Sequence, residues 1–266
     1  IMKYQHKGRI HAEIHPLRSD QGGTVSGRFS YSNPNLQQIP ARHKILGPMI
    51  RSIFVPEKKE KWVSIDYSQQ EPRLVVHYAS LLKLPKVDDV VEEYKKGEAD
   101  FHSIVAEMAN IPRRQAKDIN LGLFYSMGER KLAEQLNIPL DEAKDLFQQY
   151  HQKVPFVKML SDYCRNRAGS KGTIRTLLGR KCRFDLWEPR QYGTGKLGNL
   201  EKARAEFGPN IKRAFTHKAL NRLIQGSAAD QTKLAMKVLA EKGHVPLLQV
   251  HDELCFSSED PEQIRE

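Results

Sequence analysis

The sequence predicts an α+β fold, in which a small antiparallel sheet is built from both ends of the chain and helices occupy the middle. The first observation is a short apolar run that ends at Asp66. The second is a pair of apolar runs that flank His251, Asp252 and Glu253. Between these two elements lie several segments of helical pattern that open at Pro or Asp, as helices often do. Strands that come from distant parts of the chain and helices that come between them are typical of the α+β class.

The first acidic element is the run WVSIDYSQQEPR, residues 62–73. Val63 and Ile65 alternate with polar neighbours, which predicts a strand that Asp66 ends. From Gln70 onward the apolar residues recur at helix-face spacing. An Asp at a strand–helix junction is most often a helix cap. A carboxylate in this position can also bind a metal ion.

The second acidic element is LLQVHDELCF, residues 247–256, which predicts a hairpin with Asp252 at its tip. If the two elements pair on one sheet, Asp66 and Asp252 lie close together. Two carboxylates about 4 Å apart repel each other by roughly 4 kcal/mol at an effective dielectric constant near 20. Such a pair requires a cation, and Mg²⁺ is the cation that takes few protein ligands and completes its shell with water and phosphate.

The composition excludes several classes of protein. The chain has 266 residues, 39% of them hydrophobic, and no apolar run of membrane-spanning length, so we expect one large or two smaller units and no membrane segment. The start, IMKYQHKGR, lacks the apolar core of a signal peptide. The three cysteines (Cys164, Cys182 and Cys255) match neither a disulfide framework nor a zinc site, which favours a reducing cytosol.

The positive charge is confined to one segment. The net charge is +11, and residues 151–220 hold 16 Lys and Arg against 5 Asp and Glu, so the rest of the chain is balanced. A localised surplus of this kind favours a surface for a polyanion, most simply nucleic acid. The alternative is a solvated basic face that keeps the protein soluble.

The remaining elements are expected in the following order. Residues 9–15 and 51–55 read as strands, and 19–40 as a long loop whose Arg28, Ser30, Asn35 and Gln37 suit phosphates and sugars. Helices are expected over 74–82, 100–110 with Asp100 as N-cap, 113–127 after Pro112, 139–152 and 155–168. A hairpin over 173–184, a loop or insertion over 185–208, a long helix over 211–242 and a final helical turn near 260 follow. We expect the chain to be a fragment.

The predicted helix at 113–127 carries Arg113, Lys117, Leu121 and Tyr125 at steps of four residues. They form one slowly drifting stripe, since each step exceeds a full helical turn by about 40°. Cations can bind phosphates, while an apolar and an aromatic side chain can cover a sugar and a base. The alternative is an ordinary amphipathic helix, but cations at a helix N-terminus oppose the macrodipole and favour an anionic partner.

Four motifs, DYSQQEPRL, RRQAKDINLGLFYSMG, QGSAAD and QVHDEL, resemble in this order those of family A DNA polymerases, the group of bacterial DNA polymerase I and its phage relatives. TVSGRFSYSNPNLQQIP resembles the template-contacting segment that precedes them. The resemblance implies a right-hand architecture with an antiparallel palm sheet and inserted helical fingers. Residues 1–97 would form the first part of the palm, 98–216 the fingers and 217–266 a truncated second part of the palm. The thumb and the exonuclease-type domain would be absent.

The resemblance also implies the metal site. Asp66, Asp252 and the backbone carbonyl of Tyr67 would hold two Mg²⁺ ions, for which Mn²⁺ is a possible substitute. Lys117 would donate a proton to the leaving pyrophosphate. Glu253 would lie beside the metals as a secondary acid, or else be a solvated carboxylate at the turn.

The other implied site residues bind nucleotide and DNA. The nucleotide-binding set is Arg113, Lys117, Leu121, Tyr125, His102, Glu71, Gln70 and Ser68. In this set Glu71 would exclude a 2′-hydroxyl, and His102 would contact the β-phosphate or else only pack. The DNA-binding set is Arg28, Asn35, Gln37, Arg73, Asn221, Gln225 and His251, in which Arg73 would also hold Glu71 in place.

The chain departs from the family pattern at three positions. Leu121 stands where Phe or Tyr is common, Ser126 where Gly is usual, and His217 where Arg is usual. The 185–208 segment is longer than in the family. These departures favour a phage or viral relative and leave the sugar contact at Leu121 open.

The sequence therefore predicts a DNA-directed DNA polymerase that transfers deoxynucleotides from dNTPs to a primer 3′-OH. The expected partners are primer–template DNA, dNTP and the rest of a longer chain, with a monomer in the cytoplasm of a bacterium or a phage-infected host. One alternative is a DNA-binding polymerase fragment with impaired catalysis, against which the intact Asp66 and Asp252 argue. Another is an RNA polymerase or reverse transcriptase, and Glu71 argues against ribonucleotide substrates.

Overall fold

The computed structural model describes residues 2–20, 22–40, 43–97, 100–125, 127–191 and 195–265, so the departure at Ser126 lies outside the described residues. The chain divides into two compact units. Unit 1 comprises the described residues of 1–70, 176–179 and 225–266, and unit 2 those of 71–175 and 180–224. These boundaries differ from the predicted ones after residues 97 and 216. The assignment of palm and fingers therefore stays a prediction.

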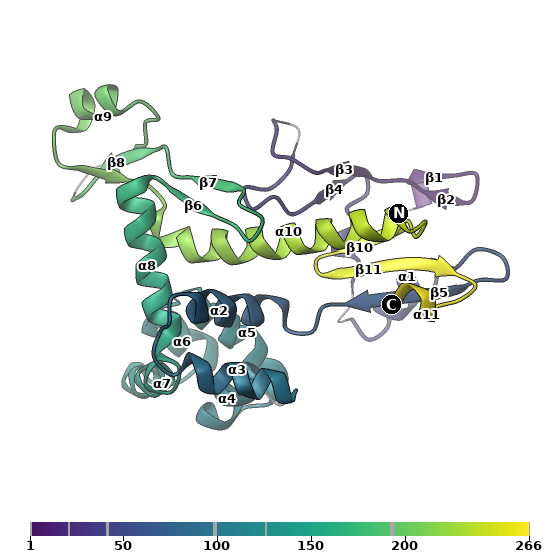
Figure 1. Ribbon diagram of the computed structural model, residues 1–266, viewed down its shortest axis with the longest axis horizontal. Helices are drawn as coiled ribbons and strands as arrows, with labels where there is room; N and C mark the ends of the chain where they lie inside the picture. The colour runs from purple at the N-terminus through teal and green to yellow at the C-terminus, as the bar shows by residue number, and fades with distance from the viewer. Residues whose placement is uncertain are drawn as a thin grey trace. The chain divides into compact units, whose positions relative to one another are not determined.

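Unit 1 is built on a three-stranded antiparallel sheet in the order β10–β11–β5, where β5 is Lys61–Asp66, β10 is Leu248–Val250 and β11 is Glu253–Ser258. Figure 1 shows β11 lying between the other two strands. The hairpin turns at His251 and Asp252, and β11 pairs along its whole length with β5. The predicted strand before Asp66 and the predicted hairpin are therefore confirmed.

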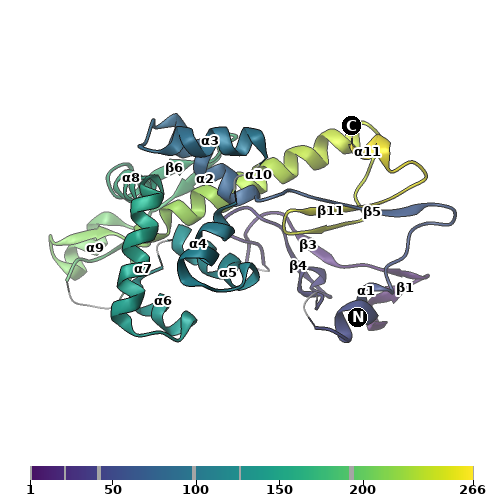
Figure 2. The same ribbon diagram turned by 90° about the horizontal axis from the view of Figure 1, so that it is seen from below.

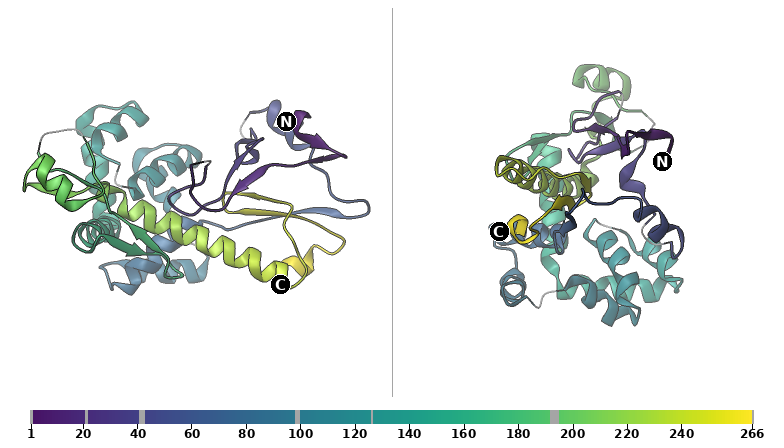
Figure 3. Two further views of the ribbon diagram at one scale, coloured as in Figure 1. Left: turned by 90° about the horizontal axis from the view of Figure 1, so that it is seen from above. Right: turned by 90° about the vertical axis from the view of Figure 1, so that its right-hand side faces the viewer.

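One face of this sheet is buried. Val63 of β5 packs with Leu254 and Phe256 of β11, because alternate residues of a strand point to the same side of a sheet. Ile264 of α11 (Glu262–Arg265) and three residues of α10 (Ala219–Glu241), namely Ala235, Met236 and Leu239, cover this cluster. Figure 3 shows the C-terminal part of α10 passing beside the sheet. Helices α10 and α11 thus cover one face of the sheet, and the side chains of the candidate site belong to the opposite face.

The first part of unit 1 consists of short elements. They are η1 (Met2–Tyr4), β1 (Gln5–His6), β2 (Arg9–Ile10), β3 (Glu13–His15), β4 (Ser30–Ser32), η2 (Leu36–Gln38) and α1 (Leu46–Arg51). The expected strand over 9–15 is two strands, which pair with β1 and β4 respectively. The predicted strand over 51–55 is wrong: Arg51 ends α1, and the amide of Ser52 bonds the carbonyl of Pro48 at 2.9 Å. Pro48 is tolerated there because the first turn of a helix lacks amide partners.

Unit 2 is mainly helical. Its helices are α2 (Gln70–Leu81, with Gln70 in unit 1), α3 (Val87–Lys96), α4 (Phe101–Ala109), α5 (Arg113–Phe124), α6 (Glu129–Leu136), α7 (Leu140–Lys153), α8 (Pro155–Lys171) and α9 (Leu200–Phe207). Phe101 lies at the centre of the core, with its ring edge-to-face against Phe124 at 5.2 Å and Phe156 at 6.2 Å. Helices α2, α4, α5, α7 and α8 agree with the sequence prediction, whereas α3 and α6 were not predicted.

The last third of unit 2 differs from the prediction. The hairpin over 173–184 is confirmed as β6 (Thr173–Arg175) and β7 (Lys181–Arg183). The segment expected as a loop contains β8 (Trp187–Pro189) and α9, and β8 pairs with β9 (Ile211–Arg213). The long helix begins at Ala219 rather than near 211, after η3 (Thr216–Lys218). Phe215 has the left-handed φ of 61°, which no helix interior accepts.

In the described part of the chain, no helix is long and apolar enough to cross a membrane.

Candidate functional site

The end of the unit 1 sheet brings the two acidic elements together. Glu253 lies opposite Asp66 in the β11–β5 register, and Asp252 directly precedes Glu253 in the hairpin turn. Directly opposed Cα atoms in antiparallel strands are about 5 Å apart. His251, with its left-handed φ of 58°, makes the tight reversal that returns the chain at this point. Asp66 and Asp252 therefore lie at the same end of the paired strands, although most of the chain separates them in the sequence.

Asp66 belongs to the face of the sheet that α10 does not cover. Trp62 and Ser64 share this face of β5, and Glu253 and Cys255 share it on β11. The Ser64 hydroxyl donates a hydrogen bond to the Glu253 carboxylate. This bond gives Glu253 a partner within the sheet, and its role beside the metals stays a prediction.

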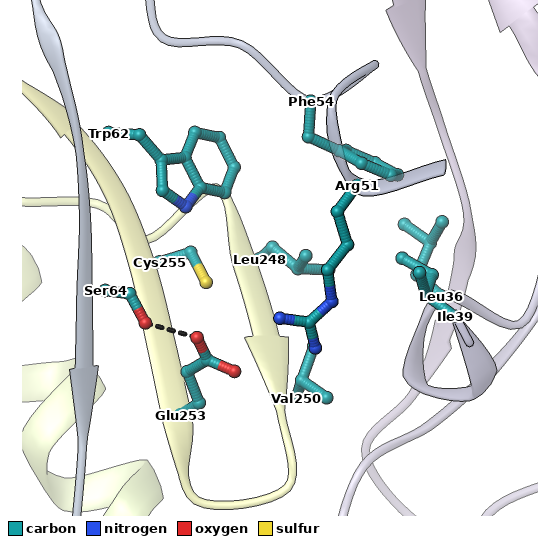
Figure 4. A pocket seen from close by; sticks show the side chains of 10 residues that line it. All are labelled: Leu36, Ile39, Arg51, Phe54, Trp62, Ser64, Leu248, Val250, Glu253 and Cys255. Carbon is teal, nitrogen blue, oxygen red and sulfur yellow. Dashed lines mark hydrogen bonds between the residues drawn. The ribbon is translucent and has the colours of Figure 1, made fainter. Parts of the chain in front are cut away.

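A cavity of about 450 Å³ adjoins this face. Figure 4 shows the side chains that line it: Leu36, Ile39, Arg51, Phe54, Trp62, Ser64, Leu248, Val250, Glu253 and Cys255. The Arg51 side chain extends into the cavity from the end of α1. Burial raises the pKa of the Cys255 thiol to about 12, and the Glu253 charge adds to the effect. The thiol is therefore protonated at neutral pH and inert as a nucleophile.

The oxygen donors at this end of the sheet fit a hard divalent cation. Within the described ranges, no three or more His, Cys, Asp or Glu side chains gather closely enough to hold a metal ion by themselves. The donors at hand are the carboxylates of Asp66 and Asp252 and the carbonyl of Tyr67, all of them oxygen. Mg²⁺ typically binds one or two carboxylates and takes its other ligands from water and substrate phosphates. This set of donors suits an ion that arrives with a phosphate-bearing substrate.

Hydrogen bonds between side-chain amides hold the β10–β11 turn in place. The Gln249 side chain, only 5% exposed, donates to the His251 carbonyl, and its oxygen accepts from the Gln37 amide at 3.1 Å. Asn35 in turn caps η2 by accepting from the backbone of Gln37 at 3.1 Å. Asn35 and Gln37, predicted to contact DNA, thus have partners inside unit 1. Sequence reasoning missed Gln249, for which the signal was a polar residue at a buried strand position.

Helix α10 holds two further segments of unit 1. The buried Gln70 amide donates to the Ala228 carbonyl, at 3.3 Å, and faces the side chains of Gln231 and Thr232 at 3.2 and 3.3 Å. Ser227 and Asp230 of the QGSAAD motif accept from the backbone of residues 177 and 178. The structure thus gives Gln70 a packing role, and its nucleotide contact stays a prediction. Asn221 and Gln225 follow each other by four residues on the same helix.

In unit 2, helix α5 carries the predicted stripe. Arg113 and Lys117 are exposed and Leu121 is half-buried, whereas the opposite face, Ala116, Ile119, Asn120, Leu123 and Phe124, is buried. Tyr125 follows the last helical residue, and its hydroxyl donates to the Glu71 carboxylate. The structure therefore brings Tyr125 and Glu71 together, and their contacts with the nucleotide stay a prediction.

The N-termini of α4 and α5 meet at Asp100, which caps α4 as predicted. Its carboxylate accepts from the His102 amide at 2.9 Å, from the Ser103 hydroxyl at 3.0 Å and from Arg113 Nε at 2.6 Å. Burial alone would raise the pKa of Asp100, but the hydrogen bonds from Arg113, His102 and Ser103 outweigh it and hold this pKa below its usual range. Asp100 is thus a fixed anion at neutral pH. Figure 2 shows α4 beside α5.

His102 is 4% exposed, and burial lowers its pKa from 6.5, with Arg113 and Lys117 acting in the same direction. The buried Asn120 amide donates to the Phe101 carbonyl and lies 3.5 Å from His102 Nδ1, while its oxygen accepts from the Tyr150 hydroxyl at 3.3 Å. Because the amide nitrogen is a donor only, Nδ1 is the unprotonated nitrogen. At neutral pH, His102 is therefore a neutral imidazole whose proton is on Nε2, the arrangement that can donate to a phosphate.

The other predicted residues have the following places. The Arg73 guanidinium stacks over the ring of Tyr94 of α3 at 4.5 Å. Ser68 lies in the exposed turn between β5 and α2. The backbone carbonyl of Arg28 accepts from the Thr24 hydroxyl at 2.8 Å, which closes a turn of the long N-terminal loop. His217 lies in η3, where burial and then Lys218 lower its pKa.

Comparisons with known proteins agree with the resemblance. The family model described as DNA polymerase family A matches residues 1–265. The DNA-directed DNA polymerase of Pseudomonas phage M6 is 36% identical over 308 aligned positions, which cover 97% of this chain and 43% of that protein. The thermostable DNA polymerase I of Thermus aquaticus is 35% identical over 264 positions, covering 94% of this chain and 28% of that protein.

A solved structure is also similar. The POL domain of Pol1 from M. smegmatis, in complex with DNA primer-template and dNTP, aligns with a TM-score of 0.74 and 29% identity, covering 98% of this chain and 43% of that one. The chain thus spans less than half the length of the relatives it matches. Because the family match extends over Asp66, the turn at Asp252 and the α5 stripe alike, the chain belongs to DNA polymerase family A.

Proposed function

We propose that this chain carries the nucleotidyl-transfer centre of a DNA-directed DNA polymerase, which adds deoxynucleotides from dNTPs to a primer 3′-OH on a DNA template. The observation that supports the proposal most strongly is the pairing of β5 with β11, since it puts Asp66 and Asp252 at the same end of the sheet. No covalent nucleophile is required, because phosphoryl transfer depends mainly on positioning and charge stabilisation.

Asp66 and Asp252, with the Tyr67 carbonyl, would hold two Mg²⁺ ions, or Mn²⁺ in their place. When bound, such ions lower the pKa of an attacking hydroxyl and neutralise charge on the leaving pyrophosphate. Glu253, held by Ser64, would keep the Asp252 turn in place from its position in β11.

In unit 2, the exposed Arg113 and Lys117 would donate hydrogen bonds to the triphosphate, and neutral His102 would donate through Nε2. Lys117 would protonate the departing pyrophosphate, since an ammonium near the developing charge is suited to general acid catalysis. Arginine suits phosphate oxygens because its fork of donors matches their geometry.

Selection of the sugar would rest on Glu71, which Tyr125 orients. Leu121, Gln70 and Ser68 would complete the surroundings of the nucleotide. The side chains proposed to contact DNA are Arg28, Asn35, Gln37, Arg73, Asn221, Gln225 and His251. We propose further that the protein acts as a monomer within a longer chain, in the cytoplasm of a bacterium or a phage-infected host, which the likeness to a phage polymerase supports.

Primer extension by the full-length protein tests this function. Asp66→Ala or Asp252→Ala should lower kcat by about 10²-fold or more, because metal-assisted charge stabilisation is worth several kcal/mol. Asp145→Ala, which alters an exposed aspartate of α7, is the matched control and should extend primers at the wild-type rate.

Two results would contradict the proposal. If either aspartate variant extends primers at a near-normal rate, the metal assignment is wrong. If the wild-type protein binds primer–template but incorporates nothing, the chain is instead a DNA-binding polymerase fragment with impaired catalysis.

A further inference from the structure

Asp100 accepts a hydrogen bond from Arg113, one of the two cations proposed to contact the triphosphate. The proposed function gives Asp100 no role. We propose that Asp100 is a positioning residue for Arg113. By accepting a hydrogen bond from Nε, it holds the guanidinium so that the terminal nitrogens are presented to the triphosphate of the incoming nucleotide. This inference rests on the proposed function and identifies a residue that sets the affinity for the nucleotide.

Asp100 contacts Arg113 at Nε and not at a terminal nitrogen. A guanidinium has five N–H donors in a planar fork, one on Nε and four on the two terminal nitrogens. Asp100 Oδ2 lies 2.6 Å from Nε of Arg113, so this contact uses the single donor at the base of the fork. The Arg113 side chain remains 58% exposed, against 21% for Asp100. The Asp100 carboxylate is thus more buried than the Arg113 side chain, and the contact leaves the terminal guanidinium nitrogens of Arg113 available to a ligand.

Asp100 is itself held by two further hydrogen bonds. Its Oδ1 accepts from the His102 amide, which is the N-cap bond of α4, and its Oδ2 also accepts from the Ser103 hydroxyl. A carboxylate held at two other points cannot follow a moving arginine. Ion pairs between mobile surface side chains constrain little, whereas this pair joins a long side chain to an anchor on the backbone. The torsions of Arg113 are therefore restricted before any ligand binds.

The Asp100–Arg113 pair lies among other charged groups. The charges of Arg113 and Lys117 both act on His102, which follows Asp100 by two residues. Two cations and one N–H donor therefore lie near the start of α4 and α5, together with the carboxylates of Asp100 and Asp118, and cations there oppose the helix dipole. Asp100 offsets part of this repulsion while it leaves the terminal nitrogens of Arg113 directed away from it. The arrangement suits an anion with several oxygens, as a triphosphate has.

Asp100→Asn is the variant that isolates this contact. Asparagine is as good an N-cap as aspartate, and its oxygen must face the His102 amide to keep that bond. The amide nitrogen then faces Arg113 Nε, so two donors oppose each other and the anchor is lost while the cap is retained. Ser103→Ala is the matched control, because it removes the other hydrogen bond to Oδ2 and leaves Arg113 in place.

The measurement is steady-state primer extension by the full-length protein, with an oligonucleotide primer–template and dTTP as the varied substrate. Asp100→Asn should raise KM for dTTP about 10-fold and change kcat less than about twofold, because a lost preorganised contact weakens binding more than chemistry. Ser103→Ala should change neither constant more than about twofold. Thermal unfolding of each variant confirms that the protein is folded.

A double-mutant cycle with Arg113→Ala shows whether Asp100 acts through the arginine. In the Arg113→Ala background, Asp100→Asn should raise KM by less than about twofold, since no guanidinium is left to position. An unchanged KM for Asp100→Asn in the wild-type background would overturn the proposal, and so would a lowered one, which would mean that Asp100 competes with the triphosphate. A full additional rise in the Arg113→Ala background would also overturn it. If the wild-type protein extends no primer, it is the proposed function that fails.

Discussion

The hydrogen bond from Tyr125 to Glu71 links two residues that lie far apart in the sequence and that are both assigned to the nucleotide. In the proposed function, a carboxylate held in this way would occupy a fixed volume beside the 2′ position of the sugar. Glu71→Ala should raise ribonucleotide incorporation, relative to deoxynucleotide, about 10- to 100-fold, because it opens space for a 2′-hydroxyl and each loss of about 1.4 kcal/mol of discrimination is tenfold. Tyr125→Phe should have a smaller effect in the same direction.

The ratio of kcat/KM for UTP and dTTP in primer extension measures this selectivity. Glu134→Ala, at an exposed glutamate of α6, should leave the ratio unchanged. Undiminished discrimination in Glu71→Ala would remove the steric role of Glu71.

His102 gives the protein a pH-dependent stability. Burial lowers its pKa in the folded state below 6.5, whereas the unfolded chain takes up the proton at its ordinary pKa. The contribution to the free energy of unfolding is therefore complete above pH 6.5 and is lost as the pH falls through 6.5 toward the lower folded-state pKa. Urea unfolding between pH 8 and 5 should show this decrease, and His102→Gln should make it shallower. An identical pH dependence in the variant would contradict the assignment.

At the scale of residues, the sequence allowed the two aspartates to be located because each ends an apolar run of strand type. It did not reveal that Asn35, Gln37 and Gln70 bond other parts of unit 1, because an amide suits a ligand or a neighbouring backbone equally well. The Asp100–Arg113 pair was likewise hidden, since Asp100 was recognised only as a cap. The partner of a polar side chain depends on tertiary packing, which a single sequence does not contain.

At the scale of elements, the end of α8 depends on the close packing of the Arg213 side chain against Gly172. Gly172 has φ +68°, and a Cβ there would lie 2.6 Å from the guanidinium carbon of Arg213. Arg213 in turn stacks over Trp187 at 4.4 Å and donates to the Phe184 carbonyl at 2.9 Å. Gly172→Ala should therefore lower the free energy of unfolding by about 1–3 kcal/mol, from left-handed strain and displacement of Arg213.

Thermal or urea unfolding measures this loss. Gly169→Ala is the control in the same helix, because nothing lies within 4 Å of its added Cβ. That variant should be neutral or stabilising by up to about 1 kcal/mol, since alanine is the better helix former. Equal stability of the two variants would mean that the contact with Arg213 is unimportant.

Elements with a strong period were predictable and irregular ones were not. Helix α5 was predicted from Pro112 at its start, and the β10–β11 hairpin from the two apolar runs that flank its turn. The segment from 185 to 218 was misjudged, because β8 and β9 are only three residues long each and are stabilised by each other rather than by local pattern. The expected strand over 51–55 shows the same limit, since its alternation was too short to decide between strand and helix end.

At the scale of the whole molecule, charge is the dominant property. All of the net charge of +11 is accounted for by residues 151–220. We expect binding of primer–template DNA to weaken by at least about 10-fold between 50 and 200 mM NaCl, as counterions compete for the phosphates. Fluorescence anisotropy of a labelled duplex at several salt concentrations measures the slope.

The location of the charge can be tested as well. Replacing three exposed lysines of this segment (Lys171, Lys181 and Lys202) by Gln should make the slope shallower. Replacing three exposed lysines elsewhere (Lys58, Lys131 and Lys237) should alter it less. Equal effects from both triple variants would show that the surplus in 151–220 has no special part in binding.

The division of the chain into units sets an order of events during synthesis. Unit 2 lies almost wholly within one stretch of the chain, whereas β5 obtains its partner β11 only from residues 253–258. A ribosome must therefore complete nearly the entire segment before the aspartate-bearing sheet can close, and the long loop between the two strands slows the search. The helical unit has its local contacts available earlier and can fold first.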